Sequence, residues 1–265
     1  MKTICSARPH GVLRLSYAVL LLFIAITACQ TGLSQSSQDP QAVAALNAAL
    51  TAMGGQAALS AIQDATVSGQ SQPSDPAASA DSFVWKSTGM SIRHEYTMTD
   101  GVHVSVVDQG QGSRMEPSGQ ITTIDPRASL TILPYHLPGI MIVSLLGAAN
   151  VSLTLINDPV NDGSLIHVSA MQQLSQPSLS LVTRQDWLFD PVSGLPIRVS
   201  IYLPDNHNQR FDGTASIVFT QWQTVSSVQV PQSMQLFFED ELQSIIRLNT
   251  PTFNQGLPAS TFQLQ

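Results

Sequence analysis

From residue 66 to the end of the chain, hydrophobic and polar residues alternate with a period of two in many short runs. A period of two places one side chain on each face of a β-strand in turn, so each run predicts a strand with one apolar face. The clearest runs are Val102/Val104/Val106, Val151/Leu153/Leu155, Ile197/Val199/Ile201/Leu203, Ala215/Ile217/Phe219 and Met234/Leu236/Phe238. Counting all such runs predicts about 11 strands.

Dipeptides that favour tight turns lie between these runs. They are Asp100-Gly101, Asp162-Gly163, Ser193-Gly194 and Asp212-Gly213. Turns of two residues connect antiparallel neighbours, whereas parallel strands need long crossovers. The chain is therefore expected to be mostly β (α+β), with antiparallel hairpins.

Two helical segments are predicted before the strands. Asp39-Pro40 can cap and open a helix, and Gly54-Gly55 can end it. Between them, apolar residues recur at spacings of three and four: Val43, Leu46, Leu50 and Met53. A second, shorter helix is expected over residues 56–62.

The apolar segment Pro138 to Ala148 shows no alternation, which predicts a buried helix or plug instead of another strand. A long sheet with one apolar face has to close or curl over something, because an open apolar face of that size favours aggregation. The leading helix and the mid-chain helix are the natural fillers. We find no internal repeat or change in composition, so residues 39–265 are expected to form a single domain.

The amino-terminal end is typical of an export signal. Lys2, Arg8 and Arg14 precede an apolar run, Tyr17 to Thr27, that is too short to span a bilayer as a helix. The run ends in Ile26-Thr27-Ala28-Cys29, which resembles the bacterial lipobox. We therefore expect residues 1–28 to be a lipoprotein signal peptide and Cys29 to be the lipid-attachment residue. The alternative is an ordinary signal peptide with an incidental cysteine.

Residues 29–38 are expected to form a lipidated flexible tether, because Thr31 to Gln38 is rich in Ser and Gln and has no pattern. The acyl chains of a bacterial lipoprotein would anchor the chain stably in a membrane. In that family an Asp after the cysteine favours the inner membrane, whereas this chain has Gln30. The predicted location is the bacterial cell envelope, at the outer membrane and facing the periplasm.

Charge and cysteine content exclude several classes of function. Beyond residue 28 the chain has 8 Lys and Arg against 18 Asp and Glu, a net charge of −10, which disfavours nucleic-acid binding. The only cysteines, Cys5 and Cys29, both lie at the amino-terminal end. The folded part therefore has no disulfide, no thiolate nucleophile and no cysteine metal site.

The sequence also lacks the local motifs of catalysis. We find no H-E-x-x-H, G-x-S-x-G, P-loop or Rossmann pattern. The acidic run 157–163 misses the spacing of a calcium loop, and Phe211 to Ser216 lacks the Asp-Thr/Ser-Gly order of aspartic proteases. The histidines of the body are scattered: His94, His103, His136, His167 and His207. We expect no enzyme activity, no metal and no cofactor.

His94 is the histidine of most interest because, at strand spacing, it shares a face with Ile92, Tyr96 and Met98. A buried histidine with a hydrogen bond is the favoured interpretation there, ahead of a catalytic one.

Several segments together resemble the LolA/LolB-like superfamily of bacterial envelope lipoproteins. They are the helix ending in Met53-Gly54-Gly55, the strand Thr66 to Gly69, the unit Trp187 to Arg198 with its D-P-x-x-G-L-P turn, and the stretch from Thr214 to Phe262. The resemblance covers most of residues 40–265. It implies a curled, incomplete antiparallel β-barrel with helices over an apolar cavity that accepts acyl chains. The predicted lipid anchor makes the chain closer to the acceptor LolB than to the carrier LolA.

We therefore expect a protein that binds or transfers an acyl-bearing lipid or lipoprotein. Residues expected to line the cavity are Phe83, Trp85, Tyr96, Ile142, Leu145, Leu153, Trp187, Phe219 and Phe238. Residues 140–146 would form a movable cover, with Pro138-Gly139 and Gly147 as hinges. Ordinary core packing explains the same aromatic residues equally well. The alternatives are an envelope scaffold or sensor that acts through a protein partner and, less favoured, a hydrolase with dispersed site residues.

Overall fold

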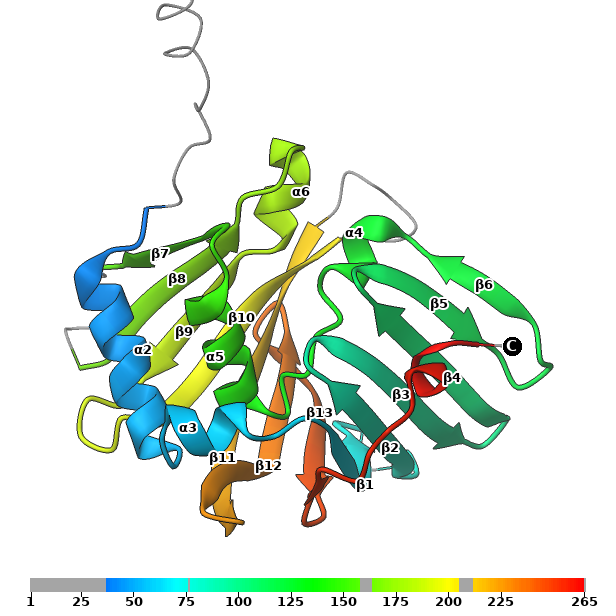
Figure 1. The fold of residues 1–265 in the computed structure, drawn as a ribbon. Coiled ribbons are helices and arrows are strands. Elements are labelled where there is room, and N and C mark those ends of the chain that lie inside the picture. Colours follow the sequence, from blue (N-terminus) through cyan, green and yellow to red (C-terminus); the bar gives the residue numbers. More distant parts are fainter. Residues whose placement is uncertain (1–36, 76, 158–163, 205–211, 265) are drawn as a thin grey trace, which may run out of the picture. The chain divides into compact units, whose positions relative to one another are not determined.

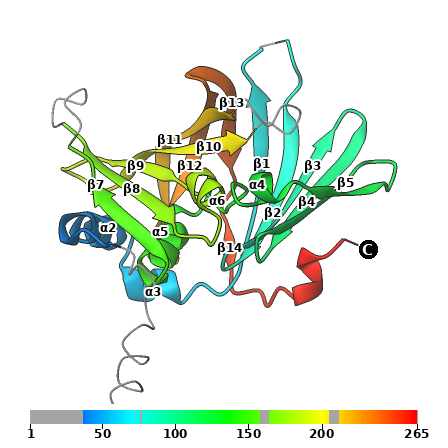
Figure 2. The same cartoon turned by 90° about the horizontal axis from the view of Figure 1, so that it is seen from above.

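One antiparallel sheet dominates the computed structural model, which describes residues 37–75, 77–157, 164–204 and 212–264. The sheet has 14 strands in the order β6-β5-β4-β3-β2-β1-β13-β12-β11-β10-β9-β8-β7, and β14 pairs with β1. The strands β6 and β7 lie at opposite ends of this order, so the sheet curls without closing (Figures 1 and 2). The expected incomplete antiparallel barrel is confirmed.

We call β1–β6 the amino-terminal half-sheet and β7–β13 the carboxyl-terminal half-sheet. The first consists of β1 (Ala65–Pro73), β2 (Asp81–Thr88), β3 (Ser91–Met98), β4 (Gly101–Asp108), β5 (Gln111–Met115) and β6 (Ile121–Ile124). The second consists of β7 (Val151–Leu155), β8 (Ile166–Gln172), β9 (Gln185–Phe189), β10 (Pro196–Pro204), β11 (Asp212–Val225), β12 (Val228–Phe238) and β13 (Glu241–Leu248). The short strand β14 spans Thr252–Phe253.

The count of about 11 strands was too low because three strands have no alternating pattern. The sequences of β5, β6 and β14 are QGSRM, ITTI and TF, and backbone pairing with a neighbour makes each of them a strand. The prediction of a turn at Asp212-Gly213 was wrong, because these residues begin β11 and pair with Pro204 and Leu203 of β10. The predicted turn at Asp162-Gly163 lies outside the described residues.

The helix α2 (Pro40–Ala52) confirms the first predicted helix. Its start follows from Asp39, whose Oδ1 accepts a hydrogen bond of 2.8 Å from the Gln41 N–H, with Pro40 at the first position. Its end requires Gly54, since φ there is +111° and a Cβ would collide with the Ser227 carbonyl oxygen. The second predicted helix, α3, is shorter than expected and spans Gln56–Ser60.

The mid-chain apolar segment forms helix α5 (Pro138–Gly147), also as predicted. Helix α5 contacts α2, α3 and β12, and α2 contacts β7 and β8 (Figure 1). Shorter helices follow other strands: α4 (Pro126–Ser129), α6 (Pro177–Val182) and the 3-10 helix η2 (Ala259–Phe262). No helix among the described residues is long and apolar enough to cross a membrane.

The main hydrophobic core lies between the sheet and the helices α2, α3 and α5. We call the sheet face that carries this core the inner face, and the opposite one the outer face. Fully buried side chains from both layers meet there, among them Leu46, Met141, Ile142, Leu153 and Trp187. Burial of apolar area at about 25 cal/mol per Å² makes this the principal stabilising layer.

A second, smaller core lies on the outer face of β4. It contains Val104, Val106 and Phe262, and the segment that carries Phe262 is held by Arg93 Nη1, which donates to the Thr261 carbonyl at 3.2 Å. The apolar alternation of β4 therefore marks the outer face, whereas an inward apolar face was expected. The reason is that the carboxyl-terminal segment covers this side of the strand.

The edge strand β7 has a partner that was not expected. The Leu153 N–H donates to the Ser37 carbonyl at 3.1 Å, and the Asp39 N–H donates to the Leu153 carbonyl at 2.9 Å. The carboxylate of Asp39 also accepts from the Leu155 N–H at 3.2 Å. The end of the predicted tether is therefore paired with the sheet, because the Ser37 carbonyl and the Asp39 N–H satisfy backbone groups that an edge strand leaves open. The predicted signal peptide, Cys29 and the rest of the tether lie outside the described residues.

Candidate functional site

The structure places eight of the nine predicted cavity residues in or against the main core. Seven of these are buried: Phe83, Trp85, Ile142, Leu145, Leu153, Trp187 and Phe219. Tyr96 is half-buried and packs against the core. Phe238 is different, because 42% of it is exposed near the end of β12, where its ring lies over Gly213. The inner face beneath the helices is therefore the candidate site.

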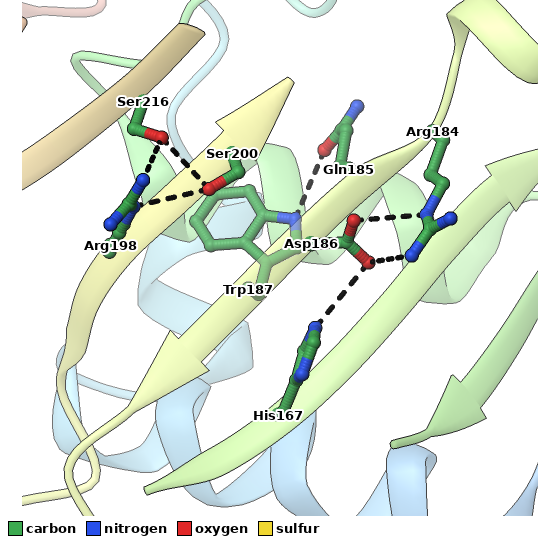
Figure 3. A network of polar contacts seen from close by, with 8 residues as sticks. All are labelled: His167, Arg184, Gln185, Asp186, Trp187, Arg198, Ser200 and Ser216. Atoms are coloured by element: carbon green, nitrogen blue, oxygen red, sulfur yellow. Dashed lines mark hydrogen bonds and ion pairs between the residues drawn. The ribbon is translucent and has the colours of Figure 1, made fainter. Parts of the chain in front are cut away.

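The inner face of the carboxyl-terminal half-sheet is almost wholly apolar. Trp187 and Phe189 on β9 and Val199 on β10 are all buried there, and Met141 and Ile142 of α5 are buried in the same core. The indole nitrogen of Trp187 donates to Gln185 Oε1 at 3.1 Å, so the polar atom of this large side chain is satisfied (Figure 3). This part of the site therefore offers a ligand apolar contact, and the indole N–H of Trp187 is not free to bind it.

Aromatic rings gather on the inner face of the amino-terminal half-sheet. Phe83 and Trp85 stack at 4.1 Å between ring centroids, and Trp85 also contacts His94 at 5.2 Å and His136 at 4.9 Å. Tyr96 lies 5.9 Å from Phe83 by the same measure. We call these five residues the aromatic cluster. The strand register explains four of them, because Trp85 pairs with His94 and Phe83 pairs with Tyr96 across β2 and β3.

His136 joins the cluster from the loop before α5 and was not predicted as a site residue. The local sequence does not indicate that His136 contacts the cluster, because the path of the loop brings the residue there. Its Nε2 and the Nε1 of Trp85 are both buried and have no hydrogen-bond partner among the described residues. Buried polar atoms are nearly always paired in folded proteins, so two unpaired nitrogens in adjacent rings are unusual.

The aromatic cluster carries no charge at neutral pH. Burial lowers the pKa of His94 to about 4. Burial, with a smaller contribution from His94, lowers the pKa of His136 to about 3. Burial also raises the pKa of Tyr96 to about 12, although the neighbouring Trp85 opposes this change. These groups can therefore donate or accept hydrogen bonds but cannot neutralise an ion.

A polar network lies on the outer face of the carboxyl-terminal half-sheet, opposite Trp187 (Figure 3). Asp186 binds Arg184 Nε at 2.9 Å and lies 3.4 Å from His167 Nε2. Arg198 donates to Ser216 Oγ at 2.6 Å, and Ser200 Oγ lies 2.9 Å from Ser216 Oγ. The sequence did not reveal this network, because the strand register brings its members together.

This outer network does not have the geometry of a nucleophilic triad. Neither ring nitrogen of His167 makes a hydrogen bond to any described residue, so no described serine is placed for His167 to activate. The contact between His167 and Asp186 therefore gives no support to the hydrolase alternative.

The other histidines do not converge on the aromatic cluster. His103 lies between Asp100 and Glu116, with nitrogen to oxygen distances of 2.9 Å to each, and Asp100 in particular raises its pKa. His207 lies outside the described residues, as do the loop around it and most of the acidic run 157–163. Within the described ranges no group of three or more His, Cys, Asp or Glu is arranged to hold a metal ion.

The fold is similar to those of several solved proteins. A domain from Vibrio parahaemolyticus, described as an outer membrane lipoprotein-sorting protein, matches with a TM-score of 0.53 and 12% identity over 83% of this chain and 95% of its own. A LolA superfamily protein from Nitrosomonas europaea matches with a TM-score of 0.51 and 10% identity, over 84% and 97% of the two chains. A DUF1329 family protein from Desulfovibrio piger gives 0.54 and 12%, over 84% and 98%.

No family model and no curated protein matches the sequence. At identities of 10 to 12% the structural likeness establishes the fold alone. The chain therefore has the LolA/LolB-like fold that its resemblance to this superfamily implied.

Proposed function

We propose that this chain, with its LolA/LolB-like fold, is a lipid-anchored protein of the bacterial envelope that binds or transfers acyl-bearing molecules without catalysis. It would be attached to the outer membrane through Cys29 and would face the periplasm. Its cargo would be a lipid or a lipoprotein. The observation that carries the proposal is the apolar inner face of the carboxyl-terminal half-sheet, which the helices α2 and α5 cover in place of a second sheet.

The composition of α5 supports a role as a cover. Its sequence is PGIMIVSLLG, so Ser144 is its only residue with a polar side chain. Met141 and Ile142 are fully buried in the core beneath the helix. If an acyl chain replaced these side chains, apolar contacts would be exchanged for apolar contacts, and each buried methylene would contribute about 0.8 kcal/mol. The opening would thus be favourable only when cargo is present.

The structure changes the expected role of one hinge residue. A Cβ on Gly139 would lie 2.6 Å from Leu59 Cδ2, so this glycine allows α5 and α3 to pack closely. Its backbone does not occupy the left-handed region that a hinge glycine would exploit. We therefore propose that α3 moves with α5, and that the opening takes place at the loop before Pro138.

A photoreactive fatty-acid probe tests the proposal. Binding to the full chain is measured as labelling yield against probe concentration. Ile142→Glu should raise the half-saturating concentration at least about tenfold, because it places a charge on the buried side of α5. Ser144→Glu, on the same helix, should change it less than about twofold. Circular dichroism checks the strand content of both variants.

Two results would contradict carriage of acyl chains. The first is that the unmodified chain is not labelled and yields no lipid on extraction and mass spectrometry. The second is that Ile142→Glu unfolds the chain while Leu146→Glu, at a half-buried position of α5, folds and is labelled normally. Either result would favour the scaffold or sensor alternative, in which the side chains of α5 permanently fill the inner face.

The lipid anchor has a separate test. Cys29→Ala should abolish metabolic labelling of the protein by a fatty-acid analogue and release it from the membrane fraction, because no other cysteine follows residue 29. Undiminished labelling of this variant would contradict the assignment of Cys29.

A further inference from the structure

Two tryptophans of the inner face differ in how their indole nitrogens are satisfied. Trp187 is fully buried and donates to Gln185. Trp85 is 5% exposed, yet its Nε1 is buried and has no partner among the described residues. The Tyr96 hydroxyl lies close enough to the indole of Trp85 for the indole to lower its pKa, but the two groups do not have the geometry of a hydrogen bond. An unpaired buried donor destabilises the unliganded protein, and a ligand that supplies an acceptor would explain why the donor is there.

A second unpaired nitrogen lies beside the first. His136 is 2% exposed, its ring centroid lies 4.9 Å from that of Trp85, and its Nε2 also lacks a partner. His136 stands two residues before Pro138, where α5 begins. The loop that would carry α5 away from the sheet therefore also bears His136, and its movement would uncover the Trp85 nitrogen.

The chemistry of the cluster restricts what can bind there. An indole N–H is only a donor, so its ligand must present an acceptor. Both imidazoles of the cluster are neutral at neutral pH, because burial lowers the pKa of His94 and of His136. A carboxylate or phosphate would therefore be buried without a compensating charge, which is strongly unfavourable. An uncharged acceptor therefore fits the cluster better than an anion does.

We propose that the aromatic cluster recognises the carbonyl oxygen of the ester or amide that links an acyl chain to its head group, with Trp85 Nε1 as the principal donor and His136 Nε2 as a second. This inference rests on the proposed function, since the acyl chain itself lies on the apolar inner face next to the cluster. The carbonyl marks the end of the chain, so the cluster fixes how far the chain enters. The protein thereby distinguishes a linked acyl chain from a plain hydrocarbon.

The test compares two photoreactive probes of equal chain length on the full chain: a diazirine-bearing fatty acyl methyl ester and the matching diazirine alkane. The unmodified protein should bind the ester about five- to tenfold more tightly, the range of one well-formed hydrogen bond. Trp85→Phe keeps an aromatic ring but removes the donor, so it should abolish the preference for the ester over the alkane. Trp222→Phe is the matched control and should preserve the preference, because Trp222 lies outside the aromatic cluster, where its ring contacts that of Phe219.

Each outcome has one meaning. If the unmodified chain binds neither probe, the proposed function fails. If it binds both probes and Trp85→Phe leaves the ester preference unchanged, acyl binding stands and recognition of the carbonyl by Trp85 is overturned. If Trp85→Phe does not fold, His136→Phe provides the decision: loss of at least half of the preference supports the inference, and an unchanged preference overturns it.

Discussion

The strand β4 and the strands of the carboxyl-terminal half-sheet bury opposite faces of the sheet, although the same alternation of residues builds them. In the carboxyl-terminal half-sheet, α2 and α5 cover the apolar inner face, and the outer face carries the polar network around Asp186. In β4 of the amino-terminal half-sheet, Val104 and Val106 lie on the outer face beneath Phe262. The inner face there carries His103 and Ser105. An apolar stripe therefore shows that one strand face is buried, and the element packed against it decides which face that is.

The largest expected effect breaks the outer core of the amino-terminal half-sheet. Phe262→Ala should lower the free energy of unfolding by about 3 kcal/mol, because it removes a buried ring that covers Val104 and Val106. Urea denaturation measures the loss. Hydrogen exchange should accelerate in β3 and β4 and remain slow in β9 and β10, if the two half-sheets are stabilised separately. Phe238→Ala, at an exposed position, should cost less than about 1 kcal/mol. Equal acceleration in both half-sheets would contradict the comparison.

Acidic pH should lower the stability of the amino-terminal half-sheet through two histidines on its inner side. The pKa values of native His94 and His136 are about 4 and 3, against 6.5 for an ordinary histidine. As the pH falls below about 6.5, the unfolded chain takes up protons that the native chain excludes, so the free energy of unfolding decreases. One such imidazole should cost about 2 kcal/mol by pH 5. Urea denaturation at several pH values measures this slope.

Other titrating groups can be separated from this effect. The pKa of Glu95 lies below its ordinary value, so it removes stability only at lower pH. His103 acts in the opposite direction because its pKa is raised, but its side chain is only half-buried, so solvent screens its ion pairs and its contribution is small. The control is His136→Phe, which should reduce the slope between pH 6.5 and 5 by about half, because His94 still titrates. An unchanged slope in this variant would show that the aromatic cluster does not titrate as described.

The smallest expected effect concerns the edge of the carboxyl-terminal half-sheet. Asp39→Ala removes the cap of α2 and the acceptor for the Leu155 N–H, and should cost about 1 kcal/mol. Asp39→Asn retains an oxygen for the cap and should recover most of the loss in thermal unfolding. If both variants are equally destabilised, the carboxylate charge, and not its geometry as a cap, would be the important property.

The sequence alone determined the features that depend on neighbours along the chain. The helices α2 and α5 follow from apolar spacing and from the positions of Asp39, Pro40 and Gly54, and the hairpin between β9 and β10 follows from its glycine turn. The combination of these local signals also indicated the LolA/LolB-like fold. Alternation along a strand also indicated which positions are buried, although not which face of the sheet they lie on.

Only the tertiary structure decided which side chains and backbone groups meet across long distances in sequence. The strands β5 and β6 exist because a neighbouring backbone pairs with them, and the edge of β7 is completed by Ser37. His136 is far from Trp85 in sequence, and the path of the loop before α5 brings the two rings together. Hydrogen bonds of this kind leave no periodic trace in the sequence, because a backbone group pairs with whatever residue the fold brings to it.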